Sequence, residues 1–387
     1  MKILFLTYHG FEEASGISKK MLAQIKGLRQ NGHEVHLCYY DIAKDGSRCR
    51  YVDDTVIKNY GKGRWASILQ RMDYSCVNDY CQQHGIELVY ARSFMNASPF
   101  VNRLFRKLKQ CGIKCLMEVP TYPYDKEFDS LPLKHTLGLW VDRLYRKKLA
   151  SYMEAIVTFS DYKSIFGQRT INISNGVDFD TLPLHHPVDN KKELHLIGVA
   201  EVHPWHGFDR MIHGLGEYYL QHPTPDTQHP DVYFHIVGGV WPAEMNGSKM
   251  APGFKPIMLR YGIEDKVIFH GRLFGEELDE VFNQCSFGVG SLARHRSGIT
   301  VIKTLKNREY ACRGIPFIYS EQDSDFDSQP YVLKAAPDET PVRVQDIVDF
   351  CQHIPEASEI RKSVEHLSWN KQMQIVIDAV TLNTEHR

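Results

Sequence analysis

The feature that most constrains the fold is an alternation of short apolar runs with amphipathic stretches along the chain. An apolar run at 2–8 is followed by a stretch from Ile17 to Leu28 in which apolar residues recur at helical spacing. An Asn-Gly pair ends this stretch, and a second apolar run follows at 34–41. The order strand, helix, turn, strand is typical of an open parallel sheet with helices on its faces, so we predict an α/β protein.

The same alternation continues along the chain, with one break. Further strands are predicted at 86–93, 114–120, 155–160, 170–178, 193–201, 232–239, 266–271, 286–291 and 316–320. Further helices are predicted at 102–112, 131–153, 209–220, 276–284, 306–312 and 368–383. The stretch 179–193 has two prolines, several charges and no periodicity, which is typical of a linker. The pattern therefore predicts two doubly wound halves.

The linker sets the predicted domain boundaries. We expect an N-terminal domain over 1–185, a C-terminal domain over 190–367, and a final helix at 368–387 that packs back on the first domain. The length of 387 residues agrees with two domains, at roughly 100–200 residues for each.

Composition argues against several classes of protein. The formal net charge of −1 gives no indication of nucleic-acid binding. No run reaches the roughly 18 apolar residues of a membrane span, and the short apolar start lacks the features of a signal peptide. The nine cysteines follow no zinc-binding or disulfide pattern, and no His-Glu-x-x-His motif occurs. We therefore expect reduced thiols, a cytoplasmic location and no metal site.

Ligands of open α/β sheets bind at the carboxyl ends of the strands, so the motifs found there are candidates for a site. The first such loop, HGFEEASGIS, carries Gly10 and Gly16, which permit close backbone approach, and it leads into a helix whose free N–H groups could bind an anion. A plain strand-to-helix turn is an equally good interpretation. The SNGVD stretch at 174–178 is a turn signal and serves mainly as a landmark.

A second candidate loop, GVAEVHPWHGFDR, lies in the predicted C-terminal domain. Gly207 and Asp209 suit the start of a helix that could bind an anion. Trp205 and His206 could line a cleft. The alternative, a buried tryptophan with a structural histidine, is equally favoured.

Residues 291–316, SLARHRSGITVIKTLKNREYACRGIP, gather basic residues just before a predicted strand. Lys306 and Arg308 can contact phosphates. Glu309 is acceptor-only when ionised and suits paired sugar hydroxyls. The alternative is a solvated, charged helix face. We favour a site, because the same segment carries Ser-Gly-Ile-Thr and ends in the apolar strand GIPFIYS.

Together these motifs resemble a family-4 glycosyltransferase of the GT-B fold, over nearly the whole chain. The matching stretches, in order, are SGIS, NGHEVHL, SNGVD, VYFHIVGG, KVIFHGRLFGEELDEVFNQCSFGVGS and EYACRGIPFI, the last corresponding to the family's E-A-M-A-C-G-x-P-V-I. The resemblance implies two Rossmann-like, doubly wound domains facing a central cleft. It also implies sugar transfer from a nucleotide-sugar donor, with retention of configuration and without a metal.

The resemblance assigns the donor to the C-terminal domain and the acceptor to the N-terminal one. Glu309 matches the second acid of the family's E-x7-E motif, which binds the donor ribose, and Gly16 matches the glycine loop that faces the donor phosphates. The nucleotide sugar, UDP- or GDP-linked, is a co-substrate, so no separate cofactor is implied. A glycan or a lipid-linked saccharide is the implied acceptor, and bacterial surface polysaccharide biosynthesis the implied setting.

The chain departs from the family pattern at three positions. Val301 stands where the first acid of E-x7-E is expected, while Glu201 and His206 fall near the arginine and lysine that hold the diphosphate. His206 could replace that lysine, but Glu201 cannot replace the arginine. Lys306 resembles the lysine of a variant subgroup with L-K-x-x-E-Y. The candidates for the missing positive charge are Arg296, Lys306 and Arg308.

These considerations give three sets of candidate residues. The candidate catalytic residues are Lys306, Arg296 and His206. The candidate donor-binding residues are Gly16, Glu309, Arg308, Gly298, Ile299, Trp205 and Gly207. In the segment EVPTYPYDKEFD at 118–129 the candidate acceptor-binding residues are Glu118, Thr121, Tyr122 and Tyr124, with a rigid proline-bearing turn as the alternative.

Two basic segments with interleaved apolar residues, 102–114 and 144–153, suggest peripheral contact with an anionic membrane, at the inner face of the plasma membrane. Ordinary solvated helix faces explain them equally well. Two alternative functions also stay open: a nucleotide-sugar binding module without turnover, and a GT-B nucleotide-sugar epimerase.

Overall fold

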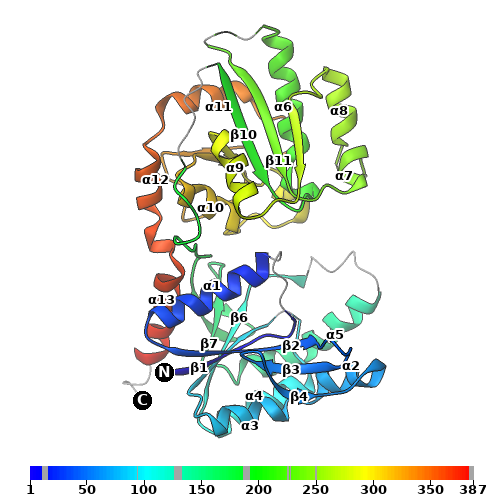
Figure 1. Ribbon diagram of the computed structural model, residues 1–387, viewed down its shortest axis with the longest axis vertical. Helices are drawn as coiled ribbons and strands as arrows, with labels where there is room; N and C mark the ends of the chain where they lie inside the picture. The colour runs from blue at the N-terminus through cyan, green and yellow to red at the C-terminus, as the bar shows by residue number, and fades with distance from the viewer. Residues whose placement is uncertain are drawn as a thin grey trace. The chain divides into compact units, whose positions relative to one another are not determined.

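A computed structural model describes residues 1–10, 16–93, 95–125, 133–185, 192–224, 226, 228–248 and 251–382, with the backbone alone at 133–136. The chain forms two compact units (Figure 1). Unit 1 comprises Met1–Gly176 with Ser368–Arg387, and unit 2 comprises Val177–Leu367. Among the described residues, no helix is both long and apolar enough to cross a bilayer.

Unit 1 is built on one sheet with the strand order β4-β3-β2-β1-β5-β6-β7-β9-β8. The strands are β1 (Lys2–Leu6), β2 (Glu34–Ile42), β3 (Arg48–Val52), β4 (Thr55–Asn59), β5 (Leu88–Arg92), β6 (Lys114–Val119), β7 (Ala155–Thr158), β8 (Ser164–Ile165) and β9 (Gln168–Asn172). Strands β2, β1, β5, β6, β7 and β9 are parallel, while β3, β4 and β8 pair antiparallel at the two edges.

The central strand β1 shows why this sequence needs helices on both faces of the sheet. Ile3, Leu4, Phe5 and Leu6 are all fully buried, and successive side chains of a strand point to opposite faces. Ile3 and Phe5 pack with α1 (Gly16–Gln30) and α13 (Trp369–Thr381). Leu4 and Leu6 pack on the other face, against the helices α3 (Ser75–Gln83), α4 (Pro99–Gln110) and α5 (Leu133–Ala150).

Helix α13 belongs to unit 1, although it follows the whole of unit 2 in the sequence. Its backbone lies so close to α1 that a Cβ atom at Gly27 would be 2.7 Å from the carbonyl carbon of Trp369. Asn31 also donates a hydrogen bond from Nδ2 to the Asn370 carbonyl at 2.8 Å. The helix predicted at 368–387 is thus α13 in its described part, and α13 covers one face of the first sheet.

Unit 2 contains a parallel sheet, of which Figure 1 labels β10 and β11. Its strand order is β12-β11-β10-β13-β14-β15. The strands are β10 (Glu193–Val199), β11 (Asp231–Val237), β12 (Val267–Gly271), β13 (Phe287–Val289), β14 (Phe317–Tyr319) and β15 (Val332–Lys334). With the strands numbered within the unit, this is the doubly wound order 3-2-1-4-5-6. Strands β11 and β12 lie on one side of β10, and β13, β14 and β15 on the other, so the switch point lies between β10 and β13. Ligands of such sheets bind outside the carboxyl ends of the strands at this switch point.

Helices cover both faces of the second sheet. One face packs against α6 (Phe208–Gln221), α8 (Phe254–Tyr261) and α11 (Val344–Phe350). The other packs against α9 (Glu276–Gln284), α10 (Leu305–Arg313) and α12 (Ala357–Ser363). The short helix α7 (Pro242–Asn246) follows β11.

The structure differs from the sequence-based expectations in several elements and in one domain boundary. In unit 2, no element is predicted where the structure has α7, α8, β15, α11 and α12. The hairpin β3–β4 and the helices α2 (Gly63–Met72) and α3 occupy a stretch for which no element is predicted. Residues 177–185, predicted to belong to the first domain, are part of unit 2. The physical reason is that Val177 is buried in the core of unit 2 and His185 N donates to the Arg313 carbonyl at 2.7 Å. The rest of the predicted linker lies largely outside the described residues.

Candidate functional site

Two short 3-10 turns meet at the switch point of the second sheet. The turn η2 (Pro204–His206) follows β10, and η3 (Arg294–Ser297) follows β13. Leu292 N donates to the His206 carbonyl at 2.9 Å, which holds the two connections together. Gly207 between η2 and α6 has φ 64°, and a Cβ there would lie 2.9 Å from the Ala293 Cβ. The glycine is therefore required by both its backbone conformation and this close approach.

The most informative feature of this edge is a group of buried polar atoms without a hydrogen-bond partner among the described residues. Lys306 Nζ, in the first turn of α10, and both carboxylate oxygens of Glu321, just after β14, belong to this group. The others nearby in the fold are Ser291 Oγ, Thr304 Oγ1 and the side-chain amide of Asn307. Because an unpaired buried polar group costs about 1–3 kcal/mol, such a concentration indicates a place for a polar ligand.

The two ionisable groups of this set are shifted toward their neutral forms. Burial, followed by the nearby Arg294 guanidinium, lowers the pKa of Lys306 to about 7. Burial raises the pKa of Glu321, which is 2% exposed, to about 7, although Arg294 and Lys306 act in the opposite direction. The site thus holds charge poorly as it stands. A ligand with anionic and hydroxyl groups would restore the charged form of both side chains.

His206 lies beside this group and is neutral. Burial, followed by the positive charges of Lys306 and Arg294, holds the pKa of His206 well below its usual value. Nδ1 of His206 accepts a hydrogen bond from His203 N at 3.0 Å, so the neutral ring carries its proton on Nε2. His206 can therefore donate a hydrogen bond, but it does not supply the positive charge of the lysine that the resemblance expects.

Arg296 does not join the group of unpartnered atoms. Its guanidinium forms a paired contact with Asp209, at 2.9 and 2.7 Å. It also bonds the Pro204 carbonyl at 2.8 Å and both oxygens of Glu339. All five N–H donors of Arg296 are thus engaged, and the side chain ties η3 to the start of α6 rather than facing a ligand.

Arg308 is likewise committed to the interior. It is fully buried and donates to both carboxylate oxygens of Asp323, at 2.7 and 3.1 Å, and to Asp325. These acids belong to the segment that follows Glu321. Arg308 therefore holds the backbone next to Glu321 in place, and the structure gives no support to direct phosphate contact.

The other predicted donor residues do not belong to the group of buried polar atoms without a partner among the described residues. Glu309 lies three residues after Lys306 on α10 and accepts a hydrogen bond from Arg313 Nε at 3.1 Å. The Trp205 ring stacks on His203, with ring centroids 4.3 Å apart, and lies 5.9 Å from the Arg294 guanidinium. Gly298 ends η3 with φ 68°, followed by half-buried Ile299. Gly16 is the exposed first residue of α1 in unit 1.

The predicted acceptor residues of unit 1 do not converge on one point. Glu118 is fully buried, and its Oε2 accepts hydrogen bonds from Gln24 Nε2 and Tyr90 Oη, both at 2.6 Å. Its Oε1 lies 3.5 Å from Lys20 Nζ and 3.8 Å from Arg92 Nε. Burial raises the pKa of Glu118, but Lys20, Arg92 and the hydrogen bonds from Tyr90 and Gln24 together lower it more, so the net shift is downward. Glu118 is therefore an ionised core residue: Oε2 accepts two hydrogen bonds, while Oε1 faces two cations without a hydrogen bond among the described residues.

The remaining acceptor candidates lie on the other face of the first sheet. Tyr124 is buried and donates from Oη to Asp142 Oδ2 at 2.6 Å. The Tyr122 ring contacts Phe166, with centroids 5.6 Å apart, and Tyr124 contacts the same ring. Thr121 is half-buried in the connecting turn. The structure thus brings Tyr122 and Tyr124 together but separates them from Glu118.

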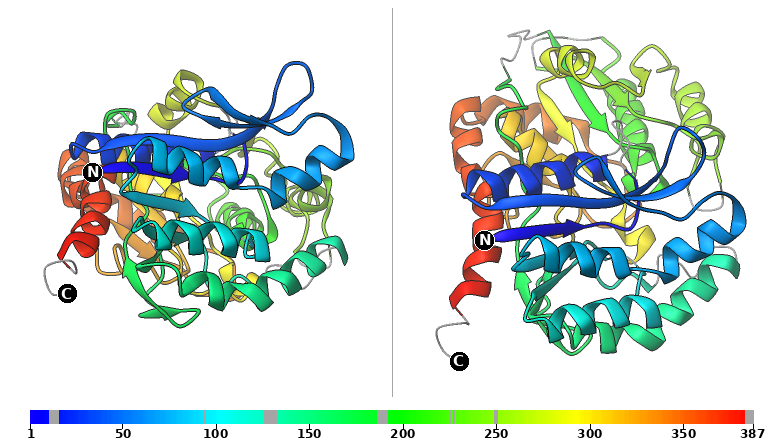
Figure 2. Two further views of the ribbon diagram at one scale, coloured as in Figure 1. Left: turned by 90° about the horizontal axis from the view of Figure 1, so that it is seen from below. Right: turned by 60° about the horizontal axis from the view of Figure 1, so that its bottom comes forward.

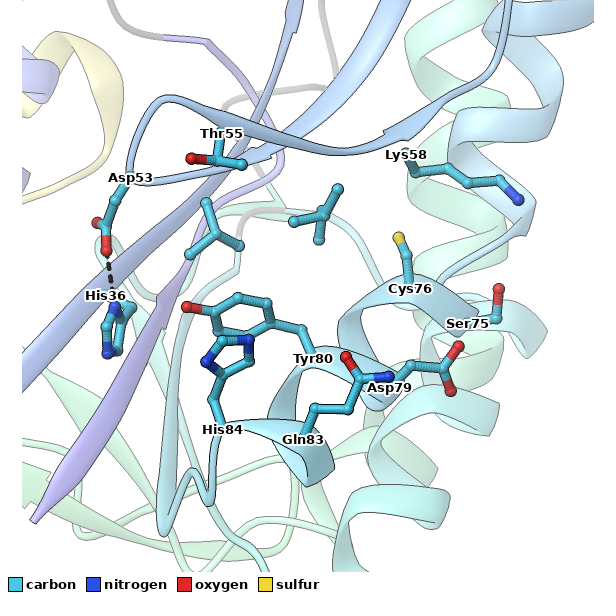
Figure 3. Close-up of a pocket in the computed structure, with 12 residues that line it drawn as sticks. His36, Asp53, Thr55, Lys58, Ser75, Cys76, Asp79, Tyr80, Gln83 and His84 are labelled. Carbon is cyan, nitrogen blue, oxygen red and sulfur yellow. Dashed lines mark hydrogen bonds and ion pairs between the residues drawn. The ribbon is translucent and has the colours of Figure 1, made fainter.

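A groove of about 680 Å³ in unit 1 was not foreseen from the sequence (Figure 3). It lies between the β3–β4 hairpin and α3. Figure 3 shows Tyr80 and His84 side by side, with ring centroids 4.0 Å apart, and the 2.7 Å hydrogen bond between His36 and Asp53. None of the candidate site residues predicted from the sequence lines the described part of this groove.

Solved structures share the architecture of both units. Sucrose-phosphate synthase from Thermosynechococcus elongatus aligns over 99% of this chain and 98% of its own, with 15% identity and a TM-score of 0.61. A glycosyltransferase from Rickettsia africae aligns over 100% and 99%, with 13% identity and a TM-score of 0.62. The trehalose-6-phosphate synthase OtsA aligns over 98% of each chain, with 10% identity and a TM-score of 0.57.

These likenesses are likenesses of fold. They confirm the predicted class, an α/β protein with two parallel-sheet domains of the GT-B type. No protein-family model and no curated protein matches the sequence. What the site does must therefore be argued from its own residues.

Proposed function

We propose that this chain is a glycosyltransferase that binds a nucleotide-sugar donor at the carboxyl edge of the second sheet. The observation that carries the proposal is the pair Lys306 and Glu321, buried at the switch point without hydrogen-bond partners among the described residues. A donor offers the complement of both groups, because its diphosphate is anionic and its sugar and ribose carry hydroxyls.

The ionisable side chains of the edge each have a role in this proposal. Lys306, with Arg294 beside it, contacts the diphosphate, and the Nε2–H of His206 donates to the same oxygens. Glu321 accepts hydrogen bonds from sugar hydroxyls. Glu309, one helical turn beyond Lys306, binds the ribose, as the family-4 resemblance implies.

Glu321 could also supply the carboxylate that family 4 has at the position of Val301. Val301 forms a parallel bridge with Gln322, and Gln322 N donates to the Thr300 carbonyl at 2.7 Å. The segment that carries Glu321 therefore runs directly beside the loop in which family 4 has its first acid. We propose that the carboxylate comes from this neighbouring segment instead.

The proposed mechanism is electrostatic. As the bond from the sugar to the diphosphate breaks, negative charge grows on the phosphate oxygens, where Lys306 and Arg294 stabilise it. Preorganised donors of this kind contribute about 2.7–4 kcal/mol each to barrier lowering in other enzymes. In a retaining transfer the departing phosphate oxygen can take the proton of the acceptor hydroxyl, so no separate base is required. Retention, metal independence and a UDP- or GDP-linked donor remain proposals based on the family-4 resemblance.

The proposal is tested by calorimetric titration and thermal unfolding with UDP, GDP and their sugar conjugates. A ligand at a hundredfold excess over its Kd stabilises the folded protein by about 2.7 kcal/mol. We expect one nucleotide to bind, and Glu321→Gln to weaken the sugar conjugate more than the bare nucleotide. Lys255→Met, at an exposed position of α8, is the control for Lys306→Met.

The outcomes separate the proposal from its alternatives. Release of nucleotide that depends on an added saccharide acceptor supports transfer. Release without any acceptor would point to an epimerase, and binding without release to a binding module. If no nucleotide binds, the donor site is wrong.

A further inference from the structure

Helix α2 exposes the side chains that a surface helix normally buries. Its buried residues are Ala66 and Gln70. Its exposed apolar residues, at the spacing i, i+3, i+4, i+7, are Trp65, Ile68, Leu69 and Met72. The Trp65 side chain is 77% exposed. A helix of a globular protein usually turns such an apolar stripe toward the core, so this stripe is available for another apolar phase.

Helix α5 presents a second stripe of the same kind. Leu137, Trp140 and Leu144 are exposed on one side, Trp140 to 59%. The exposed lysines Lys147 and Lys148 continue the same face one turn further on. Apolar side chains followed by long cationic ones are typical of helices that lie in a membrane interface.

The two stripes lie at the same end of unit 1. Strands β4 and β6 both end at the carboxyl edge of the sheet, and α2 and α5 are the next helices after them. Figures 1 and 2 show both helices at one end of this unit in each view. We call these two exposed faces together the α2–α5 surface.

Counted over the described residues, the α2–α5 surface is positively charged. Helix α2 contains no acidic residue, and the one acid of α5, Asp142, is buried. Four exposed cations form no ion pair among the described residues: Arg64, Arg71, Lys147 and Lys148. The flanking acids Asp45, Asp73 and Asp125 each face a basic side chain within 4 Å, at 3.7, 3.8 and 2.7 Å. The surface therefore favours an anionic partner, whereas a second copy of the same positive face would be repelled.

We propose that the α2–α5 surface docks the protein on an anionic phospholipid bilayer. Tryptophan is enriched at the interface between lipid and water, and this surface exposes two such side chains. Apolar contact and attraction to anionic lipid add to each other in such interfacial helices.

The docking elements differ from those that the sequence suggested. Apolar side chains of the basic segment 102–114, such as Leu104, Phe105 and Leu108, are buried in the core of unit 1, so its exposed side is mainly cationic and polar. In the segment 144–153, Leu144 is exposed, but Leu149 and Met153 are buried. Neither segment alone offers an apolar stripe.

Docking in this way would bring the carboxyl edge of the first sheet to the lipid surface. If the chain is a glycosyltransferase as proposed, this is the edge at which a lipid-linked acceptor would arrive. That consequence rests on the proposed function, whereas the docking itself rests only on the surface.

Vesicle co-sedimentation of the full chain tests the inference. We expect binding at low salt to phosphatidylcholine vesicles that contain phosphatidylglycerol, and much weaker binding to pure phosphatidylcholine. Trp65→Ser should weaken binding about tenfold or more, and Arg64→Gln with Arg71→Gln about twentyfold. Trp241→Ser, which removes a side chain 53% exposed in unit 2, is the matched control and should bind like the unaltered chain.

Tryptophan emission provides the second measurement. A shift to shorter wavelength on vesicle binding, reduced in Trp65→Ser and in Trp140→Ser, would place these rings in the interface. The inference is overturned if the chain ignores anionic vesicles at low salt, or if both variants bind unchanged. It is also overturned if light scattering shows that the variants only dissociate an oligomer. Nucleotide binding, measured on the same samples, reports the proposed function separately.

Discussion

Two buried glutamates, one in each unit, have opposite surroundings. Glu118 on β6 is fully buried, as Glu321 after β14 nearly is. Glu118 accepts two hydrogen bonds and faces two cations, and its pKa is lowered. Glu321 has no hydrogen-bond partner for either oxygen among the described residues, and its pKa is raised. Burial is the same in the two cases, so the partners decide which carboxylate is structural and which one is available to a ligand.

The cations follow the same division. Lys20, the partner of Glu118, lies with Nζ 3.4 Å from the centre of the Phe159 ring. Lys306 Nζ lies 5.6 Å from the centre of the Phe208 ring and has no hydrogen-bond acceptor within the described residues. Unit 1 thus uses its buried charges to hold its own sheet and first helix together. In unit 2, the cation Lys306 and the acid Glu321 form no side-chain hydrogen bond among the described residues.

The largest effect expected from this comparison is on stability. Glu118→Ala leaves Lys20 and Arg92 without their carboxylate, so we expect the free energy of unfolding to fall by about 3–5 kcal/mol. Glu321→Gln breaks no hydrogen bond among the described residues and should leave the free energy of unfolding unchanged or slightly raised. Urea denaturation followed by circular dichroism measures both. Equal losses in the two variants would contradict the division.

The next effect is on ligand affinity. Lys306→Met should weaken binding of the preferred nucleoside diphosphate by about 10- to 100-fold, since a hydrogen bond to a charged group contributes about 1.5–3 kcal/mol. The unfolding free energy of the ligand-free protein should not fall, because the variant removes an unpaired buried ammonium. Calorimetric titration gives the affinity. Arg308→Met should show the reverse, with a large loss of stability from the unpaired Asp323.

A smaller effect is expected with pH. Burial lowers the pKa of Lys306 to about 7 in the free protein, and a bound diphosphate favours the ammonium form. Binding therefore takes up a proton above pH 7, so affinity should fall by up to about tenfold per pH unit as the pH rises beyond that value. Lys306→Arg, which stays charged, should flatten the profile. An unchanged slope in that variant would remove Lys306 from the phosphate contact.

The smallest effect is expected at an exposed pair. Glu201 accepts from Arg272 at 2.6 and 2.9 Å, but both side chains are largely in solvent. A double-mutant cycle with Glu201→Ala and Arg272→Ala should give a coupling of less than about 1 kcal/mol. A larger value would show that exposure fails to separate structural from incidental ion pairs in this protein.

The sequence predicted the sheets better than the site. Strands such as β1 and β10 are recognised because long apolar runs are required where both faces of a sheet are covered. The β3–β4 hairpin was missed because its strands carry charges: Arg50 lies at the middle of β3, yet it is buried and donates to the Thr7 carbonyl at 3.1 Å. Periodicity does not reveal such a contact between distant segments.

The site residues show the same limit. Lys306 and His206 are candidates from the sequence because they lie in recognisable segments, and their roles stay predictions. Arg296 is also a basic residue of the candidate segment 291–316. Its ion pair with Asp209 joins residues 87 positions apart in the chain, so the sequence alone does not reveal it. Glu321 was missed, although an acid directly after the GIPFIYS strand was the available signal. Whether it has a partner depends on the fold alone.

The return of the chain to unit 1 has a consequence for biosynthesis. Helix α13 is synthesised after the whole of unit 2, yet Trp369 and Met373 belong to the core on one face of the first sheet. A Cβ at Gly176 would lie 2.4 Å from the Trp369 ring. Trp369 therefore fills the space beside Gly176, and it is synthesised after unit 2. Unit 2, continuous in sequence, can complete its core first, which reverses the usual order in which the N-terminal domain matures on the ribosome. Until the last helix arrives, the nascent first sheet keeps an apolar face that other proteins in the cell can reach.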